Sequence, residues 1–262
     1  MSKPIKARKI DVTWNNLNNK YNIVEAIDNE GYFKISADEI KEFQEPRLAV
    51  KFDHSDDRPK LFIENDLSIL PITRGDYYVS RIKAYHNFES ISSDITYLKV
   101  PEYIKSLNVN SINSESKALN MAYISGILTD FLDDEKLVPT VSGRMSSEGF
   151  VFQAAVFGDG KSISPVVGVE NSQIEIDAAY EGINSLTLME AKRDLADNFL
   201  IRQLYYPFRT WQRKMGSKPV RLVFLIYSNS IFYLYEYKFN DLQYYNSLEL
   251  VKHKRYCLEN TQ

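Results

Sequence analysis

The segment 220–227, with the sequence VRLVFLIY, limits the possible folds of this chain more than any other segment. Its length is that of a β-strand. Almost all of its residues are apolar, which indicates that both faces of the strand are buried. A helical stretch precedes it, from about Asp194 to Met215, and Gly216 and Pro219 end that helix. Residues 232–239, FYLYEYKF, predict another strand. We therefore expect an α+β fold in which helices flank a mixed central sheet.

A hairpin is predicted directly before this helix, from the strands 173–180 and 186–192 and the connecting turn EGINS. Because side chains alternate along a strand, Glu190 and Lys192 share one face of the second strand. The opposite face carries the apolar residues Met189 and Ala191. In the first strand, the polar face carries Gln173, Glu175 and Asp177, and the other face carries Ile174, Ile176 and Ala178. Folding of the hairpin can therefore bring the two charged faces together.

The pattern of an acid, any residue and a lysine is weak by itself, because it occurs five times in the chain. The five pairs are Glu39/Lys41, Glu115/Lys117, Asp134/Lys136, Glu190/Lys192 and Glu236/Lys238. The first three lie in helical or loop-like surroundings, where solvated charge is the simpler interpretation. Glu236 lies in a strand, but the strand before it carries no acid. Only Glu190/Lys192 combines an apolar strand, an acidic strand upstream and a helix downstream.

Two carboxylates and a lysine in this arrangement suit phosphodiester hydrolysis. The reaction needs an activated water and stabilisation of a transition state that carries extra negative charge. A cation of the magnesium type serves both needs and prefers carboxylate oxygens, and a neighbouring lysine can orient the water. Asp177, Glu190 and Lys192 are therefore the candidate catalytic residues, with Asp177 and Glu190 as candidate Mg²⁺ ligands. A solvated hairpin face is the alternative interpretation.

Arginine side chains near this hairpin are candidates for DNA contacts. In the helix after the hairpin, Arg202 and Arg209 lie on a face away from the apolar residues, where a row of arginines suits phosphate groups. A solvated basic face explains them equally well. Arg144 belongs to the segment 143–147, GRMSS, which we interpret as a turn with donors for phosphate or guanine. A surface loop with a solvated arginine is the alternative.

The N-terminal part predicts a smaller α+β lobe. Apolar residues at intervals of three and four predict a helix over residues 12–27, and Ser36 with Glu39 forms a capping-box pattern for a second, short helix. Strands are expected at 47–52, 60–63, 67–72 and 76–85. This order resembles a winged-helix module, and an irregular α+β lobe is the alternative. Lys41 and Arg47, near the second helix, are candidate DNA contacts.

The polar stretch 87–113 predicts the connection between two lobes. We therefore expect an N-terminal DNA-recognition lobe over residues 1–110 and a second domain over residues 111–262. A long helix capped by Ser114 begins the second domain. Residues 150–157 predict a strand after that helix.

Composition agrees with a globular intracellular protein. Hydrophobic residues make up 44% of the chain, which is enough for a sizeable core. The single cysteine, Cys257, cannot form an internal disulfide, so we expect a reducing, cytoplasmic location. The first residues show no secretory signal, and no apolar run approaches the ~20 residues of a membrane span. The net charge of −3 argues against indiscriminate coating of nucleic acid, although positive charge can concentrate in a groove.

The hairpin, its lysine and the following helix resemble the PD-(D/E)XK nuclease superfamily. Within it, the run EIDAAYEG…LMEAKRDLADNFLIRQLYYPFRTW is similar to type II restriction endonucleases, and the resemblance covers about residues 173–227. It implies a restriction-endonuclease-like mixed sheet with magnesium as the cofactor. It also implies that Asp177 and Glu190 are the metal ligands and that Lys192 is the catalytic lysine.

Three further positions bear on this resemblance. Gln203 matches a glutamine that some relatives carry on the helix after the motif. Ile176 stands where relatives usually have a proline, which is a common departure. Glu115 could supply an additional acid, although a surface charge at a helix N-terminus is the simpler interpretation.

The leading expectation is a magnesium-dependent, sequence-specific endonuclease for double-stranded DNA, of the type II restriction kind. One alternative is a repair or structure-specific nuclease, and another is a DNA-binding regulator with an inactive nuclease core. The chain offers one convincing centre, so a double-strand cut at a palindromic site predicts a homodimer. The tyrosine-rich segments 232–239 and 241–248 are candidates for its interface, with burial inside the monomer as the alternative.

Overall fold

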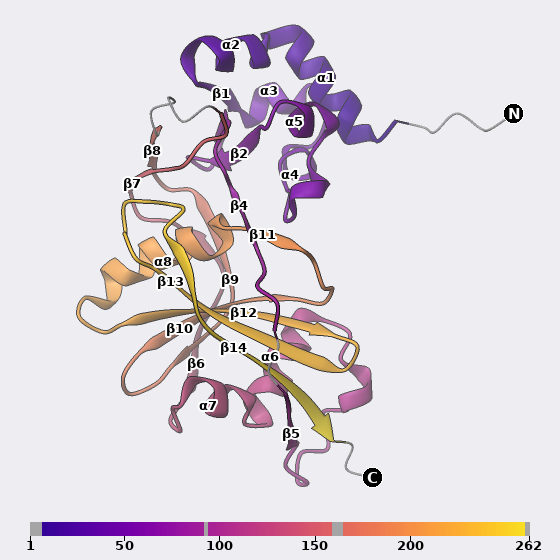
Figure 1. Cartoon of the computed structure of the whole chain (residues 1–262), viewed down its shortest axis with the longest axis vertical. Coiled ribbons are helices and arrows are strands. Elements are labelled where there is room, and N and C mark those ends of the chain that lie inside the picture. The colour runs from indigo at the N-terminus through magenta and orange to yellow at the C-terminus, as the bar shows by residue number, and fades with distance from the viewer. Residues whose placement is uncertain (1–6, 92–93, 159–164, 260–262) are drawn as a thin grey trace, which may run out of the picture.

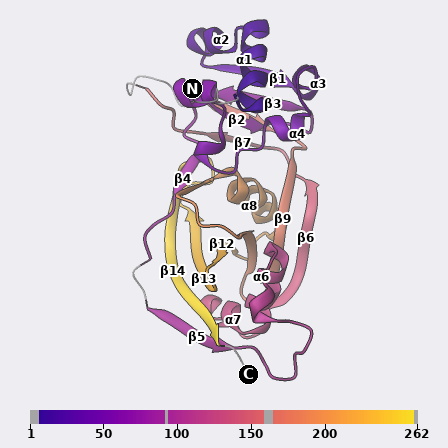
Figure 2. The same cartoon turned by 90° about the vertical axis from the view of Figure 1, so that its right-hand side faces the viewer.

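The computed structural model describes residues 7–91, 94–158 and 165–259. A small N-terminal lobe, drawn in indigo and purple, lies at one end of the molecule, and a larger lobe is built around a long twisted sheet (Figures 1 and 2). The large sheet is mostly antiparallel and helices flank it, which confirms the expected α+β fold. Within the described residues, no helix is long and apolar enough to cross a membrane.

The N-terminal lobe packs short helices against a small antiparallel sheet with the strand order β1-β3-β2. Its elements are α1 (Lys9–Tyr21), α2 (Ile23–Glu30), β1 (Tyr32–Ser36), α3 (Ala37–Lys41), α4 (Pro46–Ala49), the 3-10 helix η1 (Ser55–Asp57), α5 (Lys60–Glu64), β2 (Ser68–Pro71) and β3 (Asp76–Ser80). Trp14 and Phe62 are fully buried at the centre of this lobe, with ring centroids 4.5 Å apart.

Local chemistry determines where its first helices begin and end. Ser36 and Glu39 form the predicted capping box at the start of α3. The helix predicted over residues 12–27 is interrupted at Asn22, where a left-handed φ of 50° separates α1 from α2. Asparagine tolerates this conformation better than most residues because its short side chain can hydrogen-bond locally.

Two strands predicted for this lobe, at 47–52 and 60–63, are wrong. The helices α4 and α5 lie there instead. Pro46 is the first residue of α4, and Pro59 is the N-cap residue of α5. The fixed φ of proline favours a helical first turn, and this outweighs the strand-like composition of such short segments.

The larger lobe has its main strands in the order β5-β14-β13-β12-β10-β9-β6. Its strands are β4 (Tyr85–Asn87), β5 (Ile95–Lys99), β6 (Val138–Ser146), β7 (Phe150–Gln153), β8 (Val166–Val169), β9 (Gln173–Glu181), β10 (Leu186–Lys192), β11 (Asn198–Leu200), β12 (Val220–Ser228), β13 (Ile231–Phe239) and β14 (Leu248–Glu259). Its helices are the 3-10 helix η2 (Val109–Ser111), α6 (Glu115–Ile124), α7 (Ile127–Leu132) and α8 (Arg202–Met215). The pairs β10–β12 and β14–β5 are parallel.

Strand β12 is buried on both faces, as its sequence predicts. Leu222 and Phe224 pack toward α8, whereas Val223 and Leu225 pack toward α6 and α7. The sheet therefore separates two apolar cores, one under α8 and one under the α6–α7 pair. Strand β13 lies between β12 and β14, and its Tyr237 is 1% exposed, which agrees with the alternative of burial inside the monomer.

Several other elements differ from those predicted, mostly because segments distant in sequence pair with one another. The helix expected from residue 194 begins only at Arg202, because β11 pairs with β4 far upstream in the chain. The long helix after Ser114 is divided at Gly126, which has a φ of 81°. The segment 143–147 is largely part of strand β6 rather than a turn, because it pairs with β9. Strand β5, in residues that we assigned to the N-terminal lobe, pairs with β14 at the edge of the large sheet.

Candidate active site

Strands β9 and β10 form the predicted hairpin, which lies in the large sheet between β12 and the edge strand β6. Met189 pairs with Ala178, and β10 is also hydrogen-bonded to β12 along its whole length. Met189 and Ala191 pack into the core under α6 and α7. Since side chains alternate, Glu190 and Lys192 lie on the opposite face, on the side of α8, as predicted.

A β-bulge in β9 sets the direction of Asp177. Ile176 pairs with Gly143 and Ala179 with Val141, so β9 advances three residues where β6 advances two. Ile176 and Ala179 consequently both pack toward α8. The strict alternation predicted for β9 is therefore wrong at this point. Bulges of this kind redirect a side chain next to a functional site.

Hydrogen bonds hold one oxygen of each carboxylate. The Ala191 N–H donates to Oδ2 of Asp177 at 2.8 Å. Oε1 of Glu190 accepts from Lys192 Nζ at 2.6 Å and from Gln203 Nε2 at 2.8 Å. In the described parts of the chain, no hydrogen bond reaches Oδ1 of Asp177 or Oε2 of Glu190. These two oxygens are therefore free to bind a ligand.

Burial dominates the electrostatics of this group. Glu190 is 7% exposed, and its burial, which the charge of Lys192 only partly offsets, raises its pKa to about 8. Burial also raises the pKa of Asp177, against the opposing effects of the Ala191 N–H and Lys192. For Lys192, burial lowers the pKa, but the negative charges of Glu190, Asp53 and Asp177 outweigh it and the net shift is upward. Burial thus disfavours the charged forms of both carboxyl groups, and a bound cation would offset this cost.

The raised pKa of Glu190 predicts a pH-dependent cost to stability. A carboxyl group whose folded pKa lies above its unfolded value loses stabilising free energy as the pH rises from about 4.5 through about 8. Glu190→Gln does not titrate, so it should melt at a higher temperature than the wild type, by a margin that grows over this pH window. Each pKa unit corresponds to ~1.4 kcal/mol. Thermal unfolding of both proteins in chelator across the window tests this, and a constant margin would contradict it.

The three residues line a cleft of about 560 Å³ that both lobes enclose. Its basic side chains are Arg47, Lys51, Arg74, Arg144, Lys192 and Arg202. Its acidic side chains are Glu45, Asp53, Glu115, Glu175, Asp177 and Glu190. Side chains of both charges therefore line one concave surface, and Glu190 is the most buried acid among them.

The donor set suits a hard divalent cation of the magnesium type. Among residues 7–91, 94–158 and 165–259, no three His, Cys, Asp or Glu side chains are close enough to hold a metal ion by themselves. Magnesium, however, is commonly held by one or two carboxylates and keeps several waters. Asp177 and Glu190, each with one free oxygen, fit that requirement.

Two sequence families match successive parts of the chain. Residues 80–257 match a family described as a domain of unknown function, DUF6997. The chain belongs to the DUF6997 family. Residues 11–79 match a second domain of unknown function, DUF6996. No curated protein and no solved structure matches the chain.

The DUF6996 segment contributes residues to the cleft that the sequence did not identify. Asp53 Oδ2 lies 3.9 Å from Lys192 Nζ, and Lys51 Nζ lies 3.5 Å from the same carboxylate oxygen. Neither residue belongs to a recognisable motif, because the contact joins segments that are distant in sequence. Glu115 of the DUF6997 segment also lines the cleft, and burial raises its pKa, so it is not a simple surface charge.

The other predicted DNA contacts divide into two groups. Arg47, Arg144, Arg202 and Gln203 line the cleft. Lys41 is exposed but does not line it. Arg209 does not line the cleft either. Its Nη1 donates to Val151 O at 3.2 Å, to the Tyr205 hydroxyl at 2.7 Å and to Leu242 O in the loop after β13. These contacts tie α8 to the neighbouring strand and loop, so a structural role explains Arg209.

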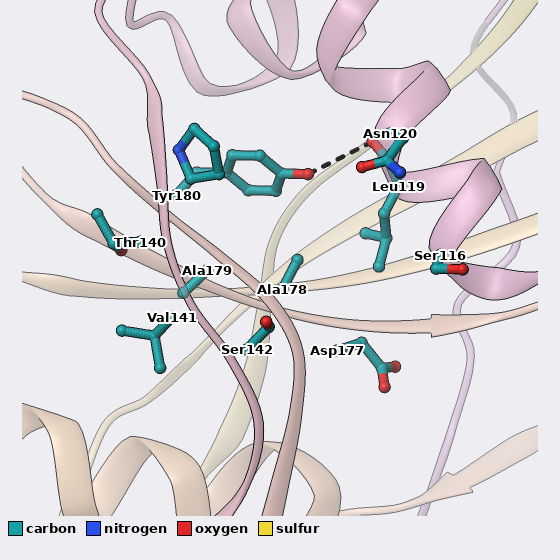
Figure 3. A pocket seen from close by; sticks show the side chains of 11 residues that line it. Ser116, Leu119, Asn120, Thr140, Val141, Ser142, Asp177, Ala178, Ala179 and Tyr180 are labelled. Carbon is teal, nitrogen blue, oxygen red and sulfur yellow. Dashed lines mark hydrogen bonds between the residues drawn. The ribbon is translucent and has the colours of Figure 1, made fainter. Parts of the chain in front are cut away.

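A second hollow of about 320 Å³ lies on the other side of Asp177, between α6 and the strands β6 and β9 (Figure 3). Its uncharged polar side chains are Ser116, Asn120, Thr140 and Ser142. The Tyr180 hydroxyl, beside it, donates to Leu119 O at 3.4 Å. Asp177 lines both hollows, so it marks the point where they meet.

Proposed function

We propose that this DUF6997 protein is a magnesium-dependent endonuclease that hydrolyses phosphodiester bonds of double-stranded DNA. The observation that carries the proposal is the meeting of Asp177, Glu190 and Lys192 at the floor of one cleft, with one free oxygen on each carboxylate. The sequence pattern and the burial of Glu190 point to the same three residues. Strongly perturbed carboxylates in a cleft are typical of functional sites.

The chain's own groups have distinct roles in this reaction. A bound divalent cation would supply an activated water and offset the charge of the transition state. Asp177 and Glu190 would hold it through their free oxygens. Lys192, 2.6 Å from Glu190 Oε1, orients the attacking water and offsets charge on the phosphate. Gln203 fixes the same carboxylate from α8 and keeps its second oxygen turned to the ligand.

The fold supports this proposal by analogy. A mixed sheet flanked by helices, with the two acidic positions on an antiparallel hairpin, is what the resemblance to PD-(D/E)XK nucleases implies. In the N-terminal lobe, the helices and the β1-β3-β2 sheet agree with a winged-helix-like module. Arg47 on α4 and Arg74 in the β2–β3 turn face the cleft from this lobe, where they can contact DNA phosphates.

A cleavage assay tests the proposal. The full chain is incubated with plasmid and phage DNA and with Mg²⁺, Mn²⁺ or chelator. Discrete fragments would indicate a site-specific restriction enzyme, and cleavage restricted to branched or damaged substrates would indicate a structure-specific nuclease. DNA binding without cleavage in any metal would overturn the proposal and favour a regulator with an inactive core.

Two copies of the single centre would be needed to cut both strands at a palindromic site, so a homodimer on DNA belongs to the same proposal. Sedimentation of the protein with and without its target DNA tests this point. A strict monomer that still makes double-strand breaks would indicate sequential nicking instead.

Arg144→Ala is expected to weaken DNA binding severalfold and to lower the slope of log affinity against log salt by about one. Arg144 lines the cleft and is half exposed, and its 3.3 Å ion pair with Glu175 is of the weak surface type that a phosphate can displace. Fluorescence anisotropy at several salt concentrations measures the effect. Arg81→Ala is the control, since Arg81 pairs with Asp28 outside the cleft. Equal affinity of Arg144→Ala and the wild type at moderate salt would exclude this contact.

A further inference from the structure

Asp53 is a carboxylate of the N-terminal lobe that reaches the centre of the larger lobe. Its Oδ2 lies 3.9 Å from Lys192 Nζ and 3.5 Å from Lys51 Nζ. The side chain of Lys51 is 74% exposed, whereas that of Lys192 is 16% exposed. The carboxylate of Asp53, from the DUF6996 segment, therefore lies between the exposed Lys51 and the buried Lys192.

The backbone around Asp53 is held in place by the larger lobe. The Leu200 N–H donates to Asp53 O at 3.1 Å. The Ser55 N–H donates to Oδ1 of Asn198 at 2.8 Å, and Nδ1 of His54 lies 2.6 Å from Asn198 O. These contacts, from Asp53 and the two residues that follow it, all go to strand β11. Specific hydrogen bonds between the lobes therefore fix the position of Asp53.

Lys192 needs more than one partner to stay in place. Its ammonium has three donors on a flexible four-carbon stem. Within the described residues, Glu190 Oε1 accepts one of them, and Asp53 supplies the second negative charge within 4 Å. Without Asp53, the ammonium would be free to move with the Glu190–Gln203 pair. A displacement of about 1 Å at such a group can cost on the order of a hundredfold in rate.

We propose that Asp53 is a positioning residue for Lys192, supplied by the N-terminal lobe, so that the hydrolytic centre is complete only when the two lobes are docked. This inference rests on the proposed function. It assigns to the DUF6996 segment a part in the chemical step as well as in DNA binding. Cleavage then depends on correct docking of the N-terminal lobe, which is also the lobe proposed to contact DNA.

The kinetic test uses the full chain under single-turnover conditions with excess enzyme. Asp53→Asn should lower the cleavage rate constant about 10- to 100-fold without raising the Kd for DNA, because loss of a negative charge cannot weaken attraction to phosphate. Asp53→Glu should restore part of the rate. Asp28→Asn is the matched control, since Asp28 is an ion-paired carboxylate of the same lobe outside the cleft. An unchanged rate constant for Asp53→Asn would overturn the inference.

A double-mutant cycle tests the contact without using activity. The melting temperatures of Asp53→Asn, Lys192→Met and the double variant should be non-additive, because the two residues interact directly. The cycle of Asp28→Asn with Lys192→Met should be additive. Additivity in the Asp53 cycle would overturn the inference whatever the activity. A wild type that cuts no DNA would instead overturn the proposed function, and with it the kinetic role of Asp53, while the cycle still decides whether Asp53 holds Lys192.

Discussion

Glu190→Gln should lower Mg²⁺-dependent DNA cleavage by about 10³-fold or more, while DNA binding and the folded structure are kept. The substitution preserves volume and the acceptor for Lys192 and Gln203, but it removes the negative charge that a divalent cation requires. Asp177→Asn and Lys192→Met should have losses of similar size, because residues that act as a unit in catalysis are strongly non-additive. Cleavage of a labelled substrate and gel-shift binding measure the two properties separately.

Matched controls are available in a second acid–X–lysine sequence. Lys136→Met and Glu135→Gln alter exposed residues of the segment Asp134–Lys136, which lies outside the cleft, and should leave cleavage unchanged. Replacing Mg²⁺ by Ca²⁺ should permit DNA binding without turnover, because calcium binds with looser geometry and longer bonds. Full activity of any of the three site variants would remove that residue from the centre.

Glu236→Ala should destabilise the protein by about 3 to 5 kcal/mol, which is the usual effect of breaking a buried ion pair. Glu236 is 6% exposed, and both its oxygens accept from Arg221, at 2.7 and 2.8 Å. Arg221 also donates to Leu132 O at the end of α7, so the pair links the sheet to that helix. A loss of this size corresponds to a fall of roughly 10 °C in Tm.

Two variants separate the loss of the pair from a general effect of mutation. Lys238→Met changes an exposed residue of the same strand and should shift stability by less than ~0.5 kcal/mol. Arg221→Met combined with Glu236→Leu removes both charges and should recover much of the stability, because no buried charge is left unpaired. A Tm for Glu236→Ala equal to that of the wild type would show that the pair does not stabilise the fold.

Glu236 also shows that an acid–X–lysine sequence can contain either a candidate metal ligand or one partner of a buried ion pair. Glu190 and Glu236 both lie in apolar strands of the same sheet and are both buried. The side chain of Glu236 has both oxygens occupied by Arg221, whereas Glu190 keeps one oxygen free. The absence of an acidic neighbour strand in the sequence was a sufficient reason to set Glu236 aside. The arginine that neutralises it could not be identified from the pattern.

The sequence alone was sufficient for the elements whose structure follows from local alternation. In β10 and β12, successive side chains face opposite sides of the sheet, and the apolar run of β12 predicts a strand that is buried on both faces. The same rule placed Glu190 and Lys192 on one face. The capping box at Ser36 is equally local, since its partners are three residues apart.

Tertiary structure decided the features that depend on a partner elsewhere in the chain. The bulge at Asp177 arises from pairing with β6, and β11 forms only because β4 lies beside it. Asp53 reaches Lys192 because its backbone is bound to β11 and not because of its neighbours in sequence. Periodicity and propensity describe one segment at a time, whereas these contacts depend on how distant segments dock. For this reason the hairpin that carries the candidate site can be predicted from the sequence, and the cleft that encloses it cannot.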